Sequence, residues 1–233
     1  RPLRMARRGN MNNADLIVRV LRDAGIGHGF GIPSGNVLPL IEAMRKGGIE
    51  FVLTAHEGSA GFAADVTGRL TGRPGLCIAT LGPGATNLTT GVGDAFLDRS
   101  PMIAITCNLN TDQLGRRLQM YIDHHALFAP ITKASLALRR GTVAATVAEA
   151  IGIAMSEPMG PVHLDLPEDV ALAQATEATP AIPGGVPQQP APDAAIATAG
   201  RIIRDARRPV AVIGSSAMRM GNLDPLKALV SSE

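Results

Sequence analysis

Short apolar runs alternate with longer stretches of helical periodicity between residues 13 and 166. In residues 13–25 the apolar side chains recur at helical spacing, with Asn13 as a possible N-cap and Gly25 at the end. A helix over 36–48 must place Pro39 in its first turn. Further helices are predicted over residues 57–72, 85–98 and 142–156. Strands are predicted over residues 28–32, 49–55, 75–80, 101–107, 133–138 and 161–166.

Strands that read as continuous apolar runs and are separated by helices indicate a parallel sheet buried on both faces. We therefore predict an α/β fold in which an open parallel sheet has helices on both faces, a three-layer α/β/α arrangement. The start of a second α/β domain is expected to follow it.

The domain boundaries follow from changes in composition. Residues 1–11 form a basic N-terminal arm, 12–170 the first domain and 171–192 a linker that contains five prolines. Residues 193–233 begin a new unit, with a helix and then a strand near 208–214. Because one helix, one strand and a partial helix cannot bury a core, we expect the chain to be cut off inside this second domain.

Composition excludes several classes of function. The net charge is only +2, four arginines lie in the first ten residues, and aromatic residues make up 3% of the chain, so a nucleic-acid surface is not expected. No apolar run reaches the ~18 residues of a membrane helix, and no signal peptide is recognisable. Cys77 and Cys107 lie in apolar runs, as buried reduced thiols do, and this favours the cytoplasm.

Three predicted loops lie where open parallel sheets bind ligands, at the carboxyl ends of strands: residues 29–36, 54–58 and 80–87. The glycines of 29–36 do not complete G-x-G-x-x-G, so a nicotinamide-binding protein is only a weak alternative. A tight strand-to-helix turn without a ligand explains this loop as well as a binding role does. In 80–87, Gly82-Pro83-Gly84 precedes a helix expected to begin at Ala85. That turn suits either a phosphate at the helix N-terminus or a flat ring against the backbone, and the spacing does not decide between them.

Glu57 is the sharpest single feature. A carboxylate in the first turn of a helix is often only a partner of the helix dipole. Here it is followed by small residues, Gly58 to Gly61, whose smooth surface allows another group to press against it. An enclosed carboxyl of this kind can hold and return a proton, so a catalytic role is the alternative.

Other constellations are absent from the sequence. No G-x-S-x-G elbow occurs. The adjacent His124 and His125 cannot easily converge on one metal ion, so no metal ligand is predicted in this chain. Whether these two histidines point toward a site is left open.

Six motifs in order, "GIPSGN", "HEGSAGFAAD", "TLGPGATN", "DAFLDRSPMIAIT", "LQMYID" and "GPVHLDLPEDV", resemble the N-terminal pyrimidine-binding domain of thiamine diphosphate-dependent enzymes of the acetolactate synthase-like superfamily. The resemblance spans residues 12–170. Residues 193–233 look like the start of the family's middle domain.

The resemblance implies roles for individual residues. Glu57 matches the glutamate that hydrogen-bonds a ring nitrogen of the cofactor's aminopyrimidine and exchanges a proton there. Gln119 matches a glutamine that faces the substrate, so both are candidate catalytic residues. The implied cofactor-binding residues are Gly31, Ile32 and Pro33 on the thiazolium side, and Thr80, Pro83, Gly84 and Asn87 on the aminopyrimidine side.

The resemblance also implies a thiamine diphosphate-dependent lyase or transferase that acts on a 2-oxo acid as a homodimer or tetramer. In this family Mg²⁺ and the diphosphate are held mainly by a separate C-terminal domain, whose Gly-Asp-Gly pattern does not occur here, so the 233-residue chain alone is expected to be inactive. A flavin is possible in the family's middle domain but is not indicated. Ser34 and Leu118 differ from the residues that are common in this family at the corresponding positions on the substrate side.

Alternatives to a carboligase therefore stay open. They are a plain 2-oxo acid decarboxylase, the pyrimidine-binding subunit of a split enzyme, and a non-catalytic dimerisation domain of the same fold.

Overall fold

The computed structural model describes residues 11–183, 189–214, 217 and 219–231. The chain divides into two compact units, residues 1–186 and 187–233. The predicted basic arm lies outside the described residues except for Met11, and so do residues 184–188 of the predicted linker.

The first unit is built on a six-stranded parallel sheet, as predicted. Its strands are β1 (His28–Gly31), β2 (Glu50–Leu53), β3 (Gly75–Thr80), β4 (Met102–Asn108), β5 (Ala134–Ala137) and β6 (Pro161–Pro167). They lie in the order β2-β1-β3-β4-β6-β5. The inner strands β3, β4 and β6 are buried along their whole length, which is why their sequences read as continuous apolar runs.

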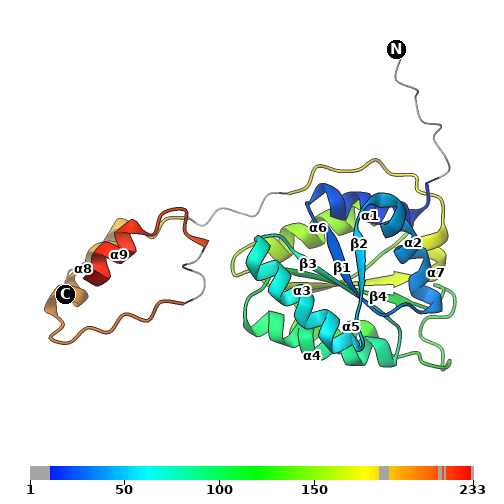
Figure 1. Ribbon diagram of the computed structural model, residues 1–233, viewed down its shortest axis with the longest axis horizontal. Helices are drawn as coiled ribbons and strands as arrows, with labels where there is room; N and C mark the ends of the chain where they lie inside the picture. The colour runs from blue at the N-terminus through cyan, green and yellow to red at the C-terminus, as the bar shows by residue number, and fades with distance from the viewer. Residues whose placement is uncertain (1–10, 184–188, 215–216, 218, 232–233) are drawn as a thin grey trace, which may run out of the picture. The chain divides into compact units, whose positions relative to one another are not determined.

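Helices cover both faces of the sheet (Figure 1). They are α1 (Asn13–Asp23), α2 (Leu38–Gly47), α3 (Glu57–Thr71), α4 (Pro83–Leu97), α5 (His124–Phe128), α6 (Val143–Met155) and α7 (Glu168–Leu172), with 3-10 turns at Gly35–Val37 and Ala129–Ile131. One apolar core joins α1, α2 and α6 to the sheet, and a second joins α3, α4 and α5 to its opposite face. The three-layer α/β/α prediction is confirmed.

The start of α1 corrects one prediction. Asn12, not Asn13, is the N-cap: its Oδ1 accepts a hydrogen bond from the amide of Asp15 (2.9 Å), and the Asp15 carboxylate accepts one from the amide of Asn12 (3.2 Å). This capping box needs an acid three residues after the cap, and only Asn12 has one. Asn13 is buried instead and donates to the Val170 carbonyl (2.9 Å). Pro39 lies in the first turn of α2, as expected.

Residues 171–183, which composition assigns to the linker, lie along the first unit. The Glu177 carboxylate accepts hydrogen bonds from the amides of Val143 and Ala144 at the start of α6 (2.7 and 3.0 Å). Glu177 thus supplies the acceptors that the first turn of a helix lacks.

The second unit contains α8 (Asp193–Asp205) and α9 (Asp224–Ser231). The strand predicted near 208–214 is not formed, and this corrects the sequence analysis. A strand needs a neighbour for its backbone groups, and the described part of this unit offers none. Val210 and Val212 are accordingly 86% and 91% exposed.

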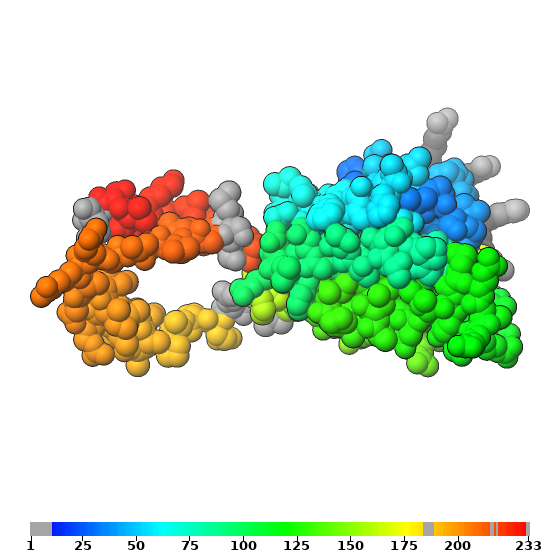
Figure 2. All heavy atoms as spheres, turned by 90° about the horizontal axis from the view of Figure 1, so that it is seen from below, coloured from blue at the N-terminus to red at the C-terminus, as the bar shows by residue number. Residues whose placement is uncertain are grey.

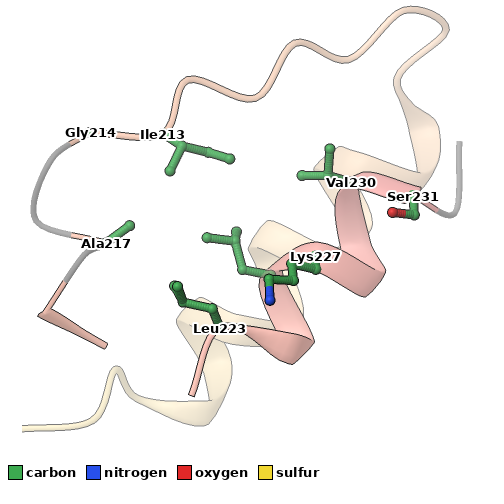
Figure 3. A pocket seen from close by; sticks show the side chains of 8 residues that line it. Ile213, Gly214, Ala217, Leu223, Lys227, Val230 and Ser231 are labelled. Atoms are coloured by element: carbon green, nitrogen blue, oxygen red, sulfur yellow. The ribbon is translucent and has the colours of Figure 1, made fainter. Parts of the chain in front are cut away.

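A pocket in the second unit lies between the chain near Ile213 and α9 (Figure 3). Its lining is mostly apolar and includes Leu223 and Val230. None of the described residues of this unit is buried, so this lining belongs to apolar surface that no core covers. We therefore assign no ligand to it.

Among the described residues, no helix combines the length and the apolar character needed to cross a bilayer.

Candidate cofactor-binding site

The candidate residues follow β1, β2 and β3 at the carboxyl edge of the sheet. β1 lies between β2 and β3, so the chain passes from β1 outward to β2 and then returns to β3 on the other side of β1. Open parallel sheets bind ligands at such a switch point. The segments that follow β1 and β3 therefore flank the expected ligand position.

Glu57 is the first residue of α3 and is only 8% exposed. The N-cap of this helix is His56, whose Nδ1 accepts a hydrogen bond from the Gly58 amide (3.0 Å). Glu57 is therefore not needed as the cap. Its Oε2 accepts a hydrogen bond from Nδ2 of Asn87, which lies one turn into α4 (3.1 Å).

The helix after β3 begins earlier than predicted. α4 starts at Pro83, not at Ala85. Proline suits the first turn because its missing N–H would have no partner there. Gly82 is the N-cap with φ 60°, a backbone conformation that favours glycine. The Gly-Pro-Gly sequence is thus a helix start that directs its first turn at Glu57.

Gly84 leaves space beside the carboxylate. A Cβ added to Gly84 would lie 3.3 Å from Glu57 Oε1 and 2.8 Å from Cγ2 of Thr80. Thr80, the last residue of β3, has a buried hydroxyl without a hydrogen-bond partner among the described residues. Buried hydroxyls in native proteins are nearly always paired. A carboxylate oxygen, a bare stretch of backbone and an unpaired hydroxyl therefore meet at one place.

The segment after β1 plays a different part. A Cβ on Gly31 would lie 2.3 Å from the carbonyl oxygen of Ile78 in β3, so the packing of the two strands by itself requires glycine there. Ile32 is half-buried and Pro33 is exposed. Both follow the strand next to β3, at the same edge of the sheet as Thr80.

Gln119 lies exposed in a turn between β4 and α5. The next residue, Met120, has φ 65°, which is uncommon for a residue other than glycine. The Met120 backbone packs against the start of α4, because a Cβ on Gly82 would lie 2.4 Å from the Met120 carbonyl oxygen. The structure thus brings the Gln119 segment to the helix start that also faces Glu57.

A buried polar cluster was missed by the sequence analysis. Thr106, His124, His163 and Asp165, which we call the histidine cluster, hydrogen-bond to one another on the sheet face covered by α4 and α5. The available signal was the spacing of His163 and Asp165, two residues apart in an apolar strand. Period-two spacing places both side chains on one face.

Two members of the histidine cluster have shifted pKa values. Burial lowers the pKa of the His163 imidazole to about 3, so this ring is neutral. Burial by itself would raise the pKa of Asp165, but the hydrogen bonds from His124 and Asn108 outweigh it and the pKa lies below its ordinary value. Asp165 is therefore a buried carboxylate held by hydrogen bonds.

Residues 11–127 match the family described as "Thiamine pyrophosphate enzyme, N-terminal TPP binding domain". The chain belongs to this family. The matched range contains Glu57, Thr80, Asn87 and Gln119 but ends before β5 and β6.

Curated relatives are similar in sequence to this chain along most of its length. A "Probable acetolactate synthase large subunit" of Methanocaldococcus jannaschii is 34% identical over 226 residues, which are 94% of this chain and 38% of that protein. The "Acetolactate synthase large subunit" of Parasynechococcus marenigrum is 35% identical over 94% of this chain and 37% of its own length. The "Acetolactate synthase isozyme 2 large subunit" of Escherichia coli is 40% identical over 70% of this chain and 30% of its own length. The chain thus spans well under half the length of these relatives.

Proposed function

We propose that this chain is the N-terminal part of a thiamine diphosphate-dependent 2-oxo acid decarboxylase or carboligase of the acetolactate synthase-like type, in which Glu57 activates the cofactor. The observation that carries the proposal is the setting of Glu57. Glu57 is buried at the start of α3, where His56 and not Glu57 caps the helix. Its carboxylate accepts a hydrogen bond from Asn87 and lies beside the backbone of Gly84.

The residues at this place fit an aminopyrimidine. Asn87 fixes Oε2 of Glu57, which leaves Oε1, on the Gly84 side, to exchange a proton with a ring nitrogen. The unpaired Thr80 hydroxyl is a partner for an adjacent polar group of the ring, and Pro83 and Gly84 supply a flat surface. Thiamine diphosphate, when bound, supplies the electron sink for breaking or making the carbon–carbon bond next to a carbonyl.

The remaining roles extend this proposal. Gly31, Ile32 and Pro33 lie on the thiazolium side, and Gln119 faces the 2-oxo acid. The curated relatives are named acetolactate synthases, which supports a substrate of that class. Because these relatives extend far beyond the matched part, we place the diphosphate and Mg²⁺ on residues outside this chain, so that the 233 residues alone are inactive.

We further propose that residues 12–170 are the pyrimidine-binding domain, that 193–233 begin the middle domain, and that the enzyme is a cytoplasmic homo-oligomer. Buried, reduced Cys77 and Cys107 are consistent with the cytoplasm. Exposed apolar side chains on α3 and α4 support the oligomer.

The test is Glu57→Gln in the complete polypeptide that carries this chain. Glutamine keeps the size of the side chain and an oxygen for Asn87 but cannot exchange the proton. Turnover of the 2-oxo acid should fall by roughly two to four orders of magnitude, the usual range for a general acid–base group. Cofactor binding and the urea midpoint should change little.

Asp15→Asn is the matched control, because Asp15 is also an acid in the first turn of a helix. It should lower stability slightly, because it removes a negative charge from the first turn of α1, and leave the turnover of the folded enzyme intact. Equal turnover of Glu57→Gln and the parent protein would reject the proton-exchange role and favour a non-catalytic dimerisation domain.

A further inference from the structure

The histidine cluster is built on two neighbouring strands, β4 and β6. Thr106 of β4 is in register with Asp165 of β6, and His163 precedes Asp165 by two residues. These three side chains therefore project from the same face of the sheet. The fourth member, His124, comes from α5, which lies over this face and also places the Phe128 ring on the His163 ring (centroids 4.3 Å apart, planes at 11°).

Short hydrogen bonds connect the cluster. The Thr106 hydroxyl lies 2.7 Å from His163 Nε2 and 2.9 Å from His124 Nδ1, and that Nδ1 lies 3.1 Å from Asp165 Oδ1. If Nδ1 of His124 carries a proton, it donates to Asp165 while the Thr106 hydroxyl donates to the neutral His163. Each of these three contacts then has one donor and one acceptor, and the Asn108 amide, whose nitrogen lies 3.3 Å from Nδ1, donates instead to Asp165 Oδ1 (2.9 Å). The other ring nitrogen of His163 is also engaged, by the Ser135 hydroxyl (2.7 Å).

These bonds hold α5 in a defined place. α5 has only five residues, and such a short helix has little stability of its own. His124 and Phe128, its first and last residues, are buried and both contact the cluster. Because hydrogen bonds are directional and a buried carboxylate needs its donors, α5 cannot slide or rotate without removing the His124 donor from Asp165, which would keep the bond from Asn108 but lose its partner on α5.

The segment just before α5 carries the candidate substrate-facing glutamine. Residues 119–123 run from Gln119 to the start of α5 at His124. At one end, the Met120 backbone packs against Gly82, and at the other, His124 is fixed by Asp165. Only three residues lie between these two attachments. The position of Gln119 therefore depends on both.

We propose that the histidine cluster is a positioning device that, through His124, fixes residues 119–123 and so sets how Gln119 meets the 2-oxo acid. His124 is a positioning residue and makes no contact with the substrate itself. The assignment of Gln119 to the substrate rests on the proposed function; the restraint on residues 119–123 does not.

A metal site is the competing interpretation of the same residues, since ligand atoms of His124, His163 and Asp165 lie within 4.8 Å of one another. Against it, those atoms are already paired by hydrogen bonds, and the Thr106 hydroxyl lies between the two imidazoles. An ion would have to replace that arrangement in a fully buried position.

The decisive pair of variants is His124→Phe and His124→Asn. Phenylalanine keeps a ring but removes Nδ1, whereas the asparagine amide can place a donor near the former Nδ1. Nε2 has no hydrogen-bond partner among the described residues, so its loss removes no bond there. In the complete polypeptide, His124→Phe should lower kcat/KM for the 2-oxo acid by about 10- to 100-fold, the cost of a misplaced group. Its affinity for thiamine diphosphate should be unchanged, and His124→Asn should recover much of the loss.

A double-mutant cycle with Gln119→Ala separates positioning from general destabilisation. If His124 acts through Gln119, His124→Phe should add little to the loss caused by Gln119→Ala. Independent, multiplicative losses would overturn the proposal. Should His124→Phe not fold, Thr106→Val, which has nearly the same shape, takes its place in the cycle.

Amide hydrogen exchange tests the restraint without reference to activity. Exchange at residues 119–123 should accelerate in His124→Phe while β3 and α4 stay protected. Unchanged exchange there would overturn the inference even if Glu57→Gln abolishes turnover. If exchange accelerates in His124→Phe but Glu57→Gln leaves turnover unchanged, the inferred restraint on residues 119–123 stands and the proposed function is rejected. A stoichiometric metal in the purified protein that disappears in His124→Phe would replace this inference with a metal site.

Discussion

At the scale of single residues, His163 makes the stability of the fold depend on pH. Burial lowers its pKa from 6.5 to about 3, so the folded protein cannot bind a proton that the unfolded chain binds below pH 6.5. The free energy of unfolding should therefore fall as the pH is lowered from 6.5 toward 3, and His163 should contribute no slope above 6.5. One such group accounts for up to about 1.4 kcal/mol per pH unit.

Urea unfolding between pH 4 and 7 measures this slope in the parent protein and in His163→Phe. The variant keeps a ring to stack on Phe128 but cannot titrate, so it should be less stable at pH 7 and show a shallower decline below 6.5. Asp165, whose pKa is lowered, loses its contribution only below its ordinary 3.8, outside this range. Parallel curves for the two proteins would show that His163 is not the group responsible.

Those parts of the candidate site that lie within short sequence motifs could be predicted from the sequence. Those parts that form only when particular strands pair in register could not. Glu57, Gly84 and Asn87 lie within two short motifs, and in the structure Asn87 hydrogen-bonds Glu57 while Gly84 lies beside the Glu57 carboxylate. The histidine cluster joins residues from β4, α5 and β6, and nothing local to any of them indicates the other two. Pairing of those elements is a property of the folded sheet.

At the scale of elements, α3 and α4 cross at two glycines. A Cβ on Gly61 would lie 2.8 Å from Cα of Gly91. The two helix backbones are in direct contact there, so no side chain can move aside to make room for an added methyl group. Gly61→Ala should destabilise the fold by about 1–3 kcal/mol through overpacking. It should also weaken the Glu57–Asn87 contact, because those residues lie on the same two helices. Urea unfolding and cofactor titration measure the two effects.

Gly93→Ala on α4 is the control for this substitution. Its Cβ would meet only Ile131 Cγ2, at 3.8 Å, which is ordinary contact. Alanine at such a helical position should stabilise by roughly 0.5–1 kcal/mol. If both variants change stability by the same amount, close packing at Gly61 is not the reason for its glycine.

The same scale explains which elements could be predicted. Inner strands were found within a residue or two because they are apolar throughout, and the longer helices because their periodicity is regular. α5 and α7, with five residues each, are too short to show a period, and their sequences gave no prediction. The strand near 208–214 failed for the opposite reason, since its apolar pattern was clear but the described part of its unit contains no partner strand.

At the scale of the whole molecule, α3 and α4 carry an exposed apolar surface that a monomer does not explain. Phe62, Val66 and Leu70 recur every four residues on α3, and Leu70 is 81% exposed. On α4, Phe96 and Leu97 are also exposed. Figure 2 shows the cyan-to-green part of the chain, which includes both helices, together on one face of the first unit. The solvent-facing side of a helix is normally polar, so this surface favours a partner.

If that partner is a second copy, Leu70→Glu should shift the complete polypeptide from an oligomer to a smaller species, because the introduced carboxylate would lose its hydration in the interface. Sedimentation equilibrium measures the mass of the variant and of the parent protein. Leu172→Glu on α7 is the control: Leu172 is 55% exposed but lies on a different helix, so its substitution should leave the mass unchanged. A Leu70→Glu protein of unaltered mass would assign the α3–α4 surface to contacts within one polypeptide, such as those with parts that this chain does not contain.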